Sequence, residues 1–189
     1  LANITIHGAG TGLDGVRILN AQSVTLDHVE ISGFTSDGIE VASTGATNIP
    51  IQIMNSSITS SAGAGVRANA TVASLPITMS NSYITNCGTG FLSRDGVTAS
   101  ITNSTISSNT IGVQADLASF VNLDRVNITS NATGISSAAN GSVIRLYGSF
   151  LQNNTTNGFN VSAPSTIVSA GNNSVQTAPA NVGTLGSIG

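Results

Sequence analysis

A glycine followed by an aliphatic residue or phenylalanine recurs along this chain at intervals of 22 to 27 residues. The pairs are Gly15-Val16, Gly38-Ile39, Gly65-Val66, Gly90-Phe91, Gly112-Val113, Gly134-Ile135 and Gly158-Phe159. Repeats of this length are typical of solenoids, in which each repeat forms one coil and packs on the next. The pattern therefore predicts a single stack of about seven coils.

Each repeat also contains two apolar positions five residues apart. They are Leu26 and Ile31, Ile53 and Ile58, Met79 and Ile84, Ile101 and Ile106, Leu123 and Ile128, Leu146 and Leu151, and Ala170 and Val175. Polar and apolar residues alternate around them, as in Val24-Thr25-Leu26, which is typical of short strands. The absence of a 3.6-residue period excludes helices, and the unreversed order disfavours hairpins. Parallel stacking should therefore place like residue on like, with an inner apolar stripe from Leu26 to Ala170.

One polar column separates these two landmarks, and asparagine is its commonest residue. It reads His28, Asn55, Asn81, Asn103, Arg125, Gly148 and Asn172. Asparagine and glycine tolerate the left-handed backbone that a sharp bend requires. We therefore expect a structural bend at this column in each coil, with stacked amides forming an asparagine ladder between coils.

The composition of the chain argues against nucleic acid and membranes as binding partners. Only 7% of residues are charged and the net charge is -3, so the sequence offers no basic footprint for nucleic acid. No apolar run reaches the roughly 20 residues of a membrane span. Cys87 is the one cysteine, so no disulfide forms within the chain. The given sequence begins Leu1-Ala2-Asn3-Ile4, with no initiator Met or charged signal region in it, and we expect it to be a mature or trimmed segment of a longer protein.

Three phrases carry a resemblance to a known family: Met54-Asn55-Ser56-Ser57-Ile58, Ser80-Asn81-Ser82-Tyr83-Ile84 and Thr102-Asn103-Ser104-Thr105-Ile106. The chain resembles the right-handed parallel β-helix repeats of the pectin-lyase-like superfamily, and its texture is similar to that of uncharacterised secreted bacterial members. The resemblance implies an all-β solenoid with three parallel sheets. We expect one β-helix domain over residues 1–175 and a tail over 176–189 that caps it. The superfamily includes lyases, hydrolases and noncatalytic stalks, so fold alone selects no function.

The polygalacturonases of this superfamily carry Asn-Thr-Asp, Asp-Asp, Gly-His-Gly and Arg-Ile-Lys motifs. Here Thr35-Ser36-Asp37 matches the first motif in part, but Ala62-Gly63-Ala64-Gly65 stands where the Asp-Asp pair is needed. The chain has no lysine and no Gly-His-Gly. Glycoside hydrolysis needs two carboxyl groups flanking the bond, so the sequence leans against an enzyme and assigns no catalytic residue.

Acidic residues gather in the first two coils. Asp14, Asp27, Glu30, Asp37 and Glu40 form the candidate ligand or Ca²⁺ site, because pectate lyases bind Ca²⁺ through several acids and abstract a proton with arginine or lysine. A surface ion-pair ladder is the other interpretation, since stacking places Arg17, Glu40 and Arg67 in one column. No other cofactor is indicated.

Two outward columns follow the bend. One reads Glu30, Ser57, Tyr83, Thr105, Asn127 and Phe150, and the other reads Ser32, Thr59, Thr85, Ser107, Thr129 and Gln152. Tyr83 and Phe150 suggest a sugar-binding patch with Tyr147, although intervening coils separate them. The Ser/Thr column is a weaker template for ordering water, as in ice-binding solenoids.

The sequence therefore favours a noncatalytic extracellular β-helix, serving as a scaffold, an adhesin-like stalk or a glycan-binding module. The alternatives are a Ca²⁺-assisted polysaccharide lyase and a water-ordering solenoid. We expect an extracellular or cell-surface bacterial protein, with polysaccharide or cell-surface glycan as its partner. Exposed strand edges also suggest self-association through the ends of the solenoid.

Overall fold

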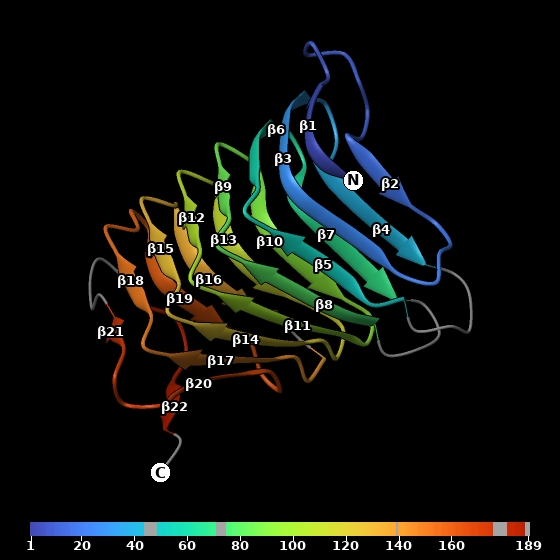
Figure 1. Ribbon diagram of the computed structural model, residues 1–189. Coiled ribbons are helices and arrows are strands. Elements are labelled where there is room, and N and C mark those ends of the chain that lie inside the picture. The colour runs from blue at the N-terminus through green and yellow to red at the C-terminus, as the bar shows by residue number, and fades with distance from the viewer. Residues whose placement is uncertain (44–48, 71–74, 139, 176–180, 188–189) are drawn as a thin grey trace.

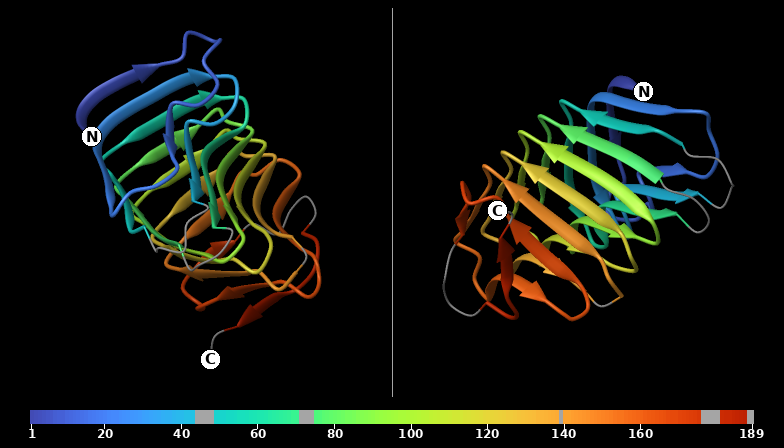
Figure 2. Two further views of the ribbon diagram at one scale, coloured as in Figure 1. Left: turned by 90° about the vertical axis from the view of Figure 1, so that its right-hand side faces the viewer. Right: turned by 90° about the horizontal axis from the view of Figure 1, so that it is seen from below.

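The computed structural model is an elongated stack of coils, described for residues 1–43, 49–70, 75–138, 140–175 and 181–187 (Figure 1). All 22 elements among these residues are β-strands, and their pairings are parallel. The amino and carboxyl ends lie at opposite ends of the stack (Figure 2). In the described part of the chain, no helix is long and apolar enough to span a membrane.

One sheet takes a strand from each of seven coils, which confirms the expected coil number. Its strands are β2 (Val16–Ile18), β4 (Ile39–Ser43), β7 (Ala64–Ala70), β10 (Thr89–Arg94), β13 (Ile111–Ala115), β16 (Thr133–Ser137) and β19 (Asn157–Val161). The repeat glycines lie at or beside the start of these strands. A Cβ at Gly90 would approach both the carbonyl oxygen of Gly112 and the Ile106 side chain to 2.5 Å. Only glycine fits this close approach between coils.

The second sheet has 15 strands and two arms that meet at β3 (Val24–Phe34). The pre-bend arm contains β5 (Ile51–Met54), β8 (Leu75–Ser80), β11 (Val97–Thr102), β14 (Phe120–Asp124), β17 (Val143–Tyr147), β20 (Thr166–Ser169) and β22 (Leu185–Ser187). The post-bend arm contains β6 (Ser57–Ser61), β9 (Tyr83–Thr85), β12 (Thr105–Ser107), β15 (Asn127–Thr129), β18 (Phe150–Gln152) and β21 (Ser174–Val175). β1 (Ala2–His7) pairs with β3 on its free side.

The expectation of three sheets is wrong, because the structure has two. β3 is 11 residues long and runs through the bend at His28 without interruption. It pairs with β5 before the bend and with β6 after it, so hydrogen bonding joins the two arms into one sheet. Later coils break at the bend into two short strands. The sequence predicted this separation in every coil, and the prediction is wrong for β3.

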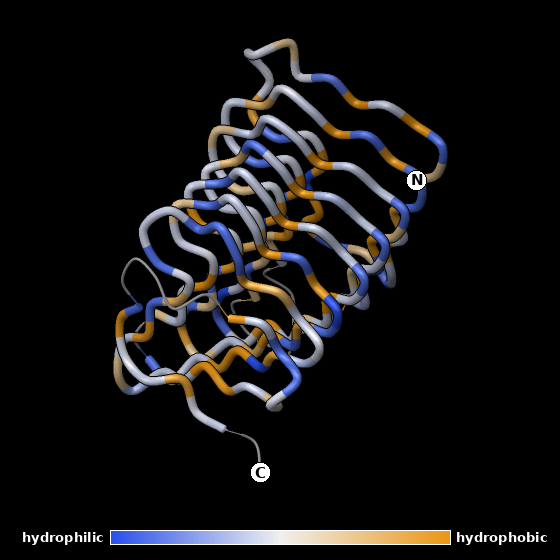
Figure 3. The backbone as a smooth tube through the Cα atoms, turned by 90° about the vertical axis from the view of Figure 1, so that its left-hand side faces the viewer, coloured by the Kyte–Doolittle hydropathy of each residue, from blue (hydrophilic) through white to orange (hydrophobic). Residues whose placement is uncertain are grey.

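The two apolar landmarks stack in register and form the core. Leu26 faces Ile53 and Ile31 faces Ile58, and the columns continue with the same alignment to Leu146 and Leu151. Apolar positions recur at equivalent points of successive coils in Figure 3. These side chains are buried, and each contributes about 1.5–3 kcal/mol of hydrophobic stabilisation.

The last coil departs from this register. Leu146 faces Ser169 rather than Ala170, so the expected end of the inner stripe is wrong by one residue. Phe150 faces Ser174, which leaves four residues (170–173) in this bend opposite three (147–149) in the previous one. Beyond it, β22 pairs with β20 and Val182 bridges Asn160. The rest of the expected tail, 176–180 and 188–189, lies outside the described residues.

A buried asparagine ladder closes the corner between the post-bend arm and the seven-stranded sheet. The Oδ1 of Asn131 accepts the backbone N–H of Asn109 at 2.9 Å, and the Oδ1 of Asn154 accepts that of Asn131 at 3.1 Å. Each Nδ2 donates to a backbone carbonyl of the preceding coil. The sequence placed an asparagine ladder at the bend column instead, where the amides are exposed and Asn81 reaches Asn55 at 3.4 Å.

Cys87 occupies the same inner column as this ladder. Its backbone N–H donates to the Oδ1 of Asn109 at 2.9 Å, and its side chain is buried. Burial raises the pKa of the Cys87 thiol above its ordinary value. Cys87 is therefore a core residue in its thiol form rather than a surface nucleophile.

A serine ladder closes the corner at the bend itself. The hydroxyls of Ser56, Ser82 and Ser104 accept the backbone N–H groups of Val29, Ser56 and Ser82 at 3.1–3.2 Å. Each hydroxyl donates in turn to the carbonyl two residues before it. These bonds satisfy backbone donors where the strands separate, and they fix the bend residues at the surface.

Candidate functional site

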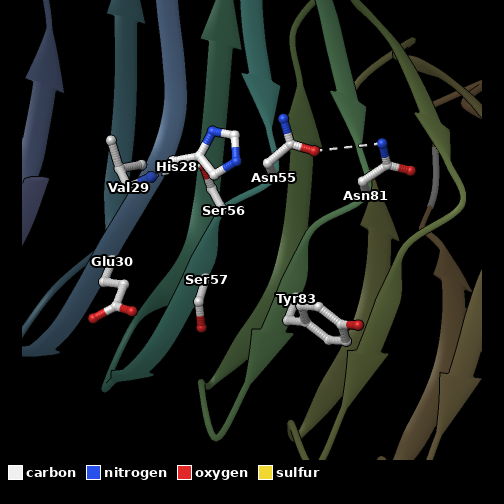
Figure 4. A pocket seen from close by; sticks show the side chains of 8 residues that line it. All are labelled: His28, Val29, Glu30, Asn55, Ser56, Ser57, Asn81 and Tyr83. Atoms are coloured by element: carbon white, nitrogen blue, oxygen red, sulfur yellow. Dashed lines mark hydrogen bonds between the residues drawn. The ribbon is translucent and has the colours of Figure 1, made fainter. Parts of the chain in front are cut away.

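A groove of about 370 Å³ runs across the bends of three successive coils (Figure 4). Two rows of side chains line it, and Val29 and Ser56 lie between the rows. The bend row consists of His28, Asn55 and Asn81, and the outward row consists of Glu30, Ser57 and Tyr83. Each of the three coils contributes one residue to each row. The first coil contributes both of its residues from β3, whereas the next two coils contribute an asparagine from the bend and the first residue of β6 or β9.

The left-handed backbone of the bend column places its side chains on the surface once per coil. Six residues of the column have positive φ: His28 (51°), Asn55 (51°), Asn81 (48°), Asn103 (47°), Arg125 (53°) and Gly148 (52°). In the last coil Gly171 has this conformation, with φ of 74°, and Asn172 follows it. The extra residue in that bend accounts for the shift. Asn172 still contacts the column, because its Oδ1 accepts the N–H of Gly148 at 2.9 Å.

Hydrogen bonds connect the bend row to an acidic residue beside it. Asn81 Nδ2 donates to Asn55 Oδ1 at 3.4 Å, and Asn55 Nδ2 donates to Asp27 Oδ1 at 2.9 Å. His28 Nδ1 lies 2.8 Å from the same Asp27 oxygen. The hydrogen bond from Asn55 and the neighbouring His28 lower the pKa of Asp27 below its ordinary value. Asp27 is therefore an ionised acceptor that orients two residues of the groove.

Replacing Asn55 by glycine is expected to raise the pKa of Asp27 toward its ordinary value, because the carboxylate loses the donor that lowers it most. Glycine tolerates the positive φ at this position, so the backbone should not change. NMR titration of the Asp27 carboxyl carbon measures the shift. Asn103→Gly is the matched control, since Asn103 instead accepts from Arg125, and it should leave Asp27 unchanged.

The sign of the effect on stability follows from the lowered pKa. A carboxyl group with a lower pKa in the folded than in the unfolded chain stabilises the fold above the unfolded value, and that contribution is lost as pH falls through the folded value. The Asn55→Gly variant should therefore lose less stability on acidification below about pH 4 than the parent. Identical Asp27 titration in the variant and the parent would contradict this assignment.

The outward row gives the groove its aromatic wall. Glu30, Ser57 and Tyr83 are in register on adjacent strands. The Tyr83 side chain is exposed, with 59% of its surface accessible, and Thr5 Oγ1 lies 3.4 Å from Glu30 Oε2. An exposed ring beside amide, hydroxyl and carboxylate groups can stack on an apolar face and hydrogen-bond to hydroxyls. The sequence predicted both rows and the bend between them, but not that the bend turns the two rows toward one groove.

The structure divides the five candidate acids between two faces. Glu30 lines the groove and Asp27 adjoins it. The other three acids, Asp14, Asp37 and Glu40, lie at or just before the first residues of β2 and β4 in the seven-stranded sheet. Across the described residues, no three His, Cys, Asp or Glu side chains are grouped in a way that could hold a metal ion. The five acids therefore do not converge on one place.

Asp37 belongs to a buried ion pair with Arg67. Asp37 is 1% exposed, its Oδ2 lies 2.5 Å from Arg67 Nε, and its Oδ1 accepts the backbone N–H of Ala64 at 2.6 Å. The hydrogen bond from Arg67 to Asp37 raises the pKa of the guanidinium group. Arg17 pairs with Glu40 at 2.6 Å. Two separate ion pairs thus stand where the sequence predicted an alternating ladder, because Arg67 turns to Asp37.

Comparison with known families agrees with this architecture. The family described as "Right handed beta helix region" matches residues 14–175, which cover most of the chain. Neither a curated protein nor a solved structure matches the chain. The match confirms the resemblance to right-handed β-helix repeats that the sequence indicated. With its parallel coils and in-register columns, the chain belongs to the right-handed β-helix family.

Proposed function

We propose that this protein is a noncatalytic extracellular β-helix that binds carbohydrate in the groove beside Tyr83. The observation that carries the proposal is the exposed Tyr83 ring at one end of a groove lined by amides, a hydroxyl and a carboxylate. Aromatic rings stack on the C–H faces of sugars, and Asn and Glu side chains complement sugar hydroxyls as donors and acceptors.

The electrostatics of the chain support a carbohydrate rather than a polyanion. Charged residues make up 7% of the sequence and the net charge is -3, which gives nucleic acids no attraction to this surface. Groove residues Asn55, Asn81 and Ser57 are uncharged, and Glu30 is the acidic residue of the lining. A ligand with many hydroxyl groups and little charge is therefore the best match for these side chains.

The engagement of Asp27 favours binding over hydrolysis. A glycosidase needs one carboxyl group to protonate the leaving oxygen and a second to act from the other side of the bond. Asp27 accepts from Asn55 and neighbours His28, which makes it an orienting group for the bend row. Glu30 alone then faces the groove as a carboxylate.

Substituting Tyr83 by alanine is expected to weaken oligosaccharide binding by up to about tenfold, because an aromatic contact contributes about 0.5–1.5 kcal/mol beyond its buried area. Isothermal titration calorimetry against a panel of plant, algal and bacterial oligosaccharides measures the change. Tyr83→Phe should retain most of the affinity. Tyr147→Ala is the matched control, since Tyr147 lies on the pre-bend arm outside the groove.

Two results would refute the proposal. One is equal affinity for the Tyr83→Ala variant and the parent, which would remove the ring from the site. The other is turnover, detected as new reducing ends or unsaturated products during incubation with polysaccharides, which would make the protein an enzyme.

A further inference from the structure

The outer face of the post-bend arm continues the groove along the solenoid. In β9, β12, β15 and β18, the central residues Ile84, Ile106, Ile128 and Leu151 point into the core and are buried. The residues on either side of each point outward. Two outward columns result: Tyr83, Thr105, Asn127 and Phe150, and beside them Thr85, Ser107, Thr129 and Gln152.

An exposed aromatic ring lies at each end of the first column. Tyr83 is 59% exposed and Phe150 is 51% exposed, and both are among the few large apolar side chains that the described residues leave accessible. The six residues between and beside them carry hydroxyl or amide groups, and none is charged. This surface, which we call the aromatic strip, complements a neutral ligand that carries many hydroxyl groups.

The spacing of the coils sets the distance between the rings. Strands in a sheet lie about 4.8 Å apart, so the three steps from Tyr83 through Thr105 and Asn127 to Phe150 span about 14 Å. An extended β-1,4-linked pyranose chain advances by nearly the same distance per sugar as the solenoid does per coil. Sugars n and n+3 of such a chain therefore reach the two rings together.

We propose that the aromatic strip binds an extended, neutral, linear polysaccharide that lies parallel to the solenoid axis. Tyr83 stacks on one sugar and Phe150 on the third sugar beyond it, while Thr105 and Asn127 hydrogen-bond to the sugars between them. This proposal rests on the carbohydrate-binding function above and extends it by naming the ligand class, its direction and a second stacking residue outside the groove.

Length dependence tests the proposal. Calorimetric titration with cello-, xylo- and mannooligosaccharides of two to six units should show affinity rising up to four or five units in at least one series and then levelling off. Phe150→Ala should weaken binding of the tetrasaccharide and longer chains about tenfold and leave the disaccharide unaffected. Tyr83→Ala should weaken binding at every length.

Controls separate folding from recognition. Phe150 is half exposed, so its replacement should not unfold the chain, and thermal melting followed by circular dichroism checks this. Phe150→Tyr should restore binding of long chains. Leu19→Ala removes an equally exposed apolar side chain in the first coil and should leave affinity unchanged at every length.

The outcomes distinguish this proposal from the one on which it rests. Loss of binding in Tyr83→Ala, with no effect of Phe150→Ala on the length dependence, would overturn the strip and leave the groove as the site. Tighter binding of oligouronates than of neutral chains would overturn the neutral ligand class. Thermal hysteresis or ice shaping, with no oligosaccharide binding, would assign the hydroxyl columns to water and overturn both proposals.

Discussion

The Asn131→Ala variant is expected to unfold with a free energy about 3 kcal/mol lower than that of the parent, because each buried polar group left without a partner costs about 1–3 kcal/mol. Asn131 is fully buried, and its Oδ1 accepts both the backbone N–H and the Nδ2 of Asn109, at 2.9 and 3.0 Å. Its own Nδ2 donates to the carbonyl of Ile106 at 3.2 Å. Alanine supplies none of these bonds.

Urea denaturation followed by circular dichroism measures this loss. Asn127→Ala is the matched control in the same coil, because Asn127 points outward and surface substitutions change stability by only about 0.5 kcal/mol. A comparable loss in both variants would show that the buried ladder contributes no more than the exposed amide. Asn131→Gln keeps the amide but adds a methylene to a packed corner, and it should also destabilise the fold.

Arg67→Met is expected to destabilise the fold by about 3–5 kcal/mol, because it leaves the Asp37 carboxylate buried without its cation. Asp37 keeps the N–H of Ala64 at 2.6 Å but loses both contacts to the guanidinium group. Removing the acid as well should restore part of the stability, so the double variant Asp37→Asn/Arg67→Met should be more stable than Arg67→Met alone. Chemical denaturation of the parent, Asp37→Asn, Arg67→Met and the double variant completes a double-mutant cycle.

The more exposed ion pair, between the first and second coils, is the control for this cycle. Arg17 pairs with Glu40, but 57% of the Arg17 side chain is accessible, and exposed pairs contribute about 0–1 kcal/mol. Arg17→Met should therefore change stability little. If Arg67→Met lowered the free energy of unfolding as little as Arg17→Met does, the buried Asp37 pair would contribute no more than an exposed one.

The coil repeat and its register followed from the sequence, because parallel stacking forces equivalent residues into columns and the apolar ones repeat. Leu26 over Ile53 and Ile31 over Ile58 needed only the spacing of the landmarks. The left-handed bends at Asn55 and Asn81 could also be predicted, since few residue types tolerate that backbone.

The side-chain contacts at the corners between sheets could not be predicted from the sequence. Asn109 and Asn103 are the same residue type six positions apart, yet one is buried in a ladder and the other is exposed at a bend. The difference depends on which side chain turns inward to accept a backbone N–H, and the repeat gives no sign of this. The partner of Arg67 was missed for the same reason: column stacking favoured Glu40, whereas the buried Asp37 lies before the strand and outside that column.

The groove shows the same limit. Glu30 and Tyr83 belong to one column and Asn55 to another, and the sequence treated the two columns as unrelated. The left-handed residue between the strands folds the two columns toward one space. A site that forms across a bend therefore requires the backbone geometry as well as the repeat.

Nearest-neighbour pairing also has a mechanical consequence. Beyond β3, which ties both arms to one continuous strand, each strand pairs with its counterparts one coil away. Tension applied to the carboxyl end would then detach coils one at a time, and a coil of 22 residues would release roughly 70–80 Å of slack. Such a chain yields to force in small, regular steps and dissipates work at each of them, while the coils not yet reached keep their surface intact.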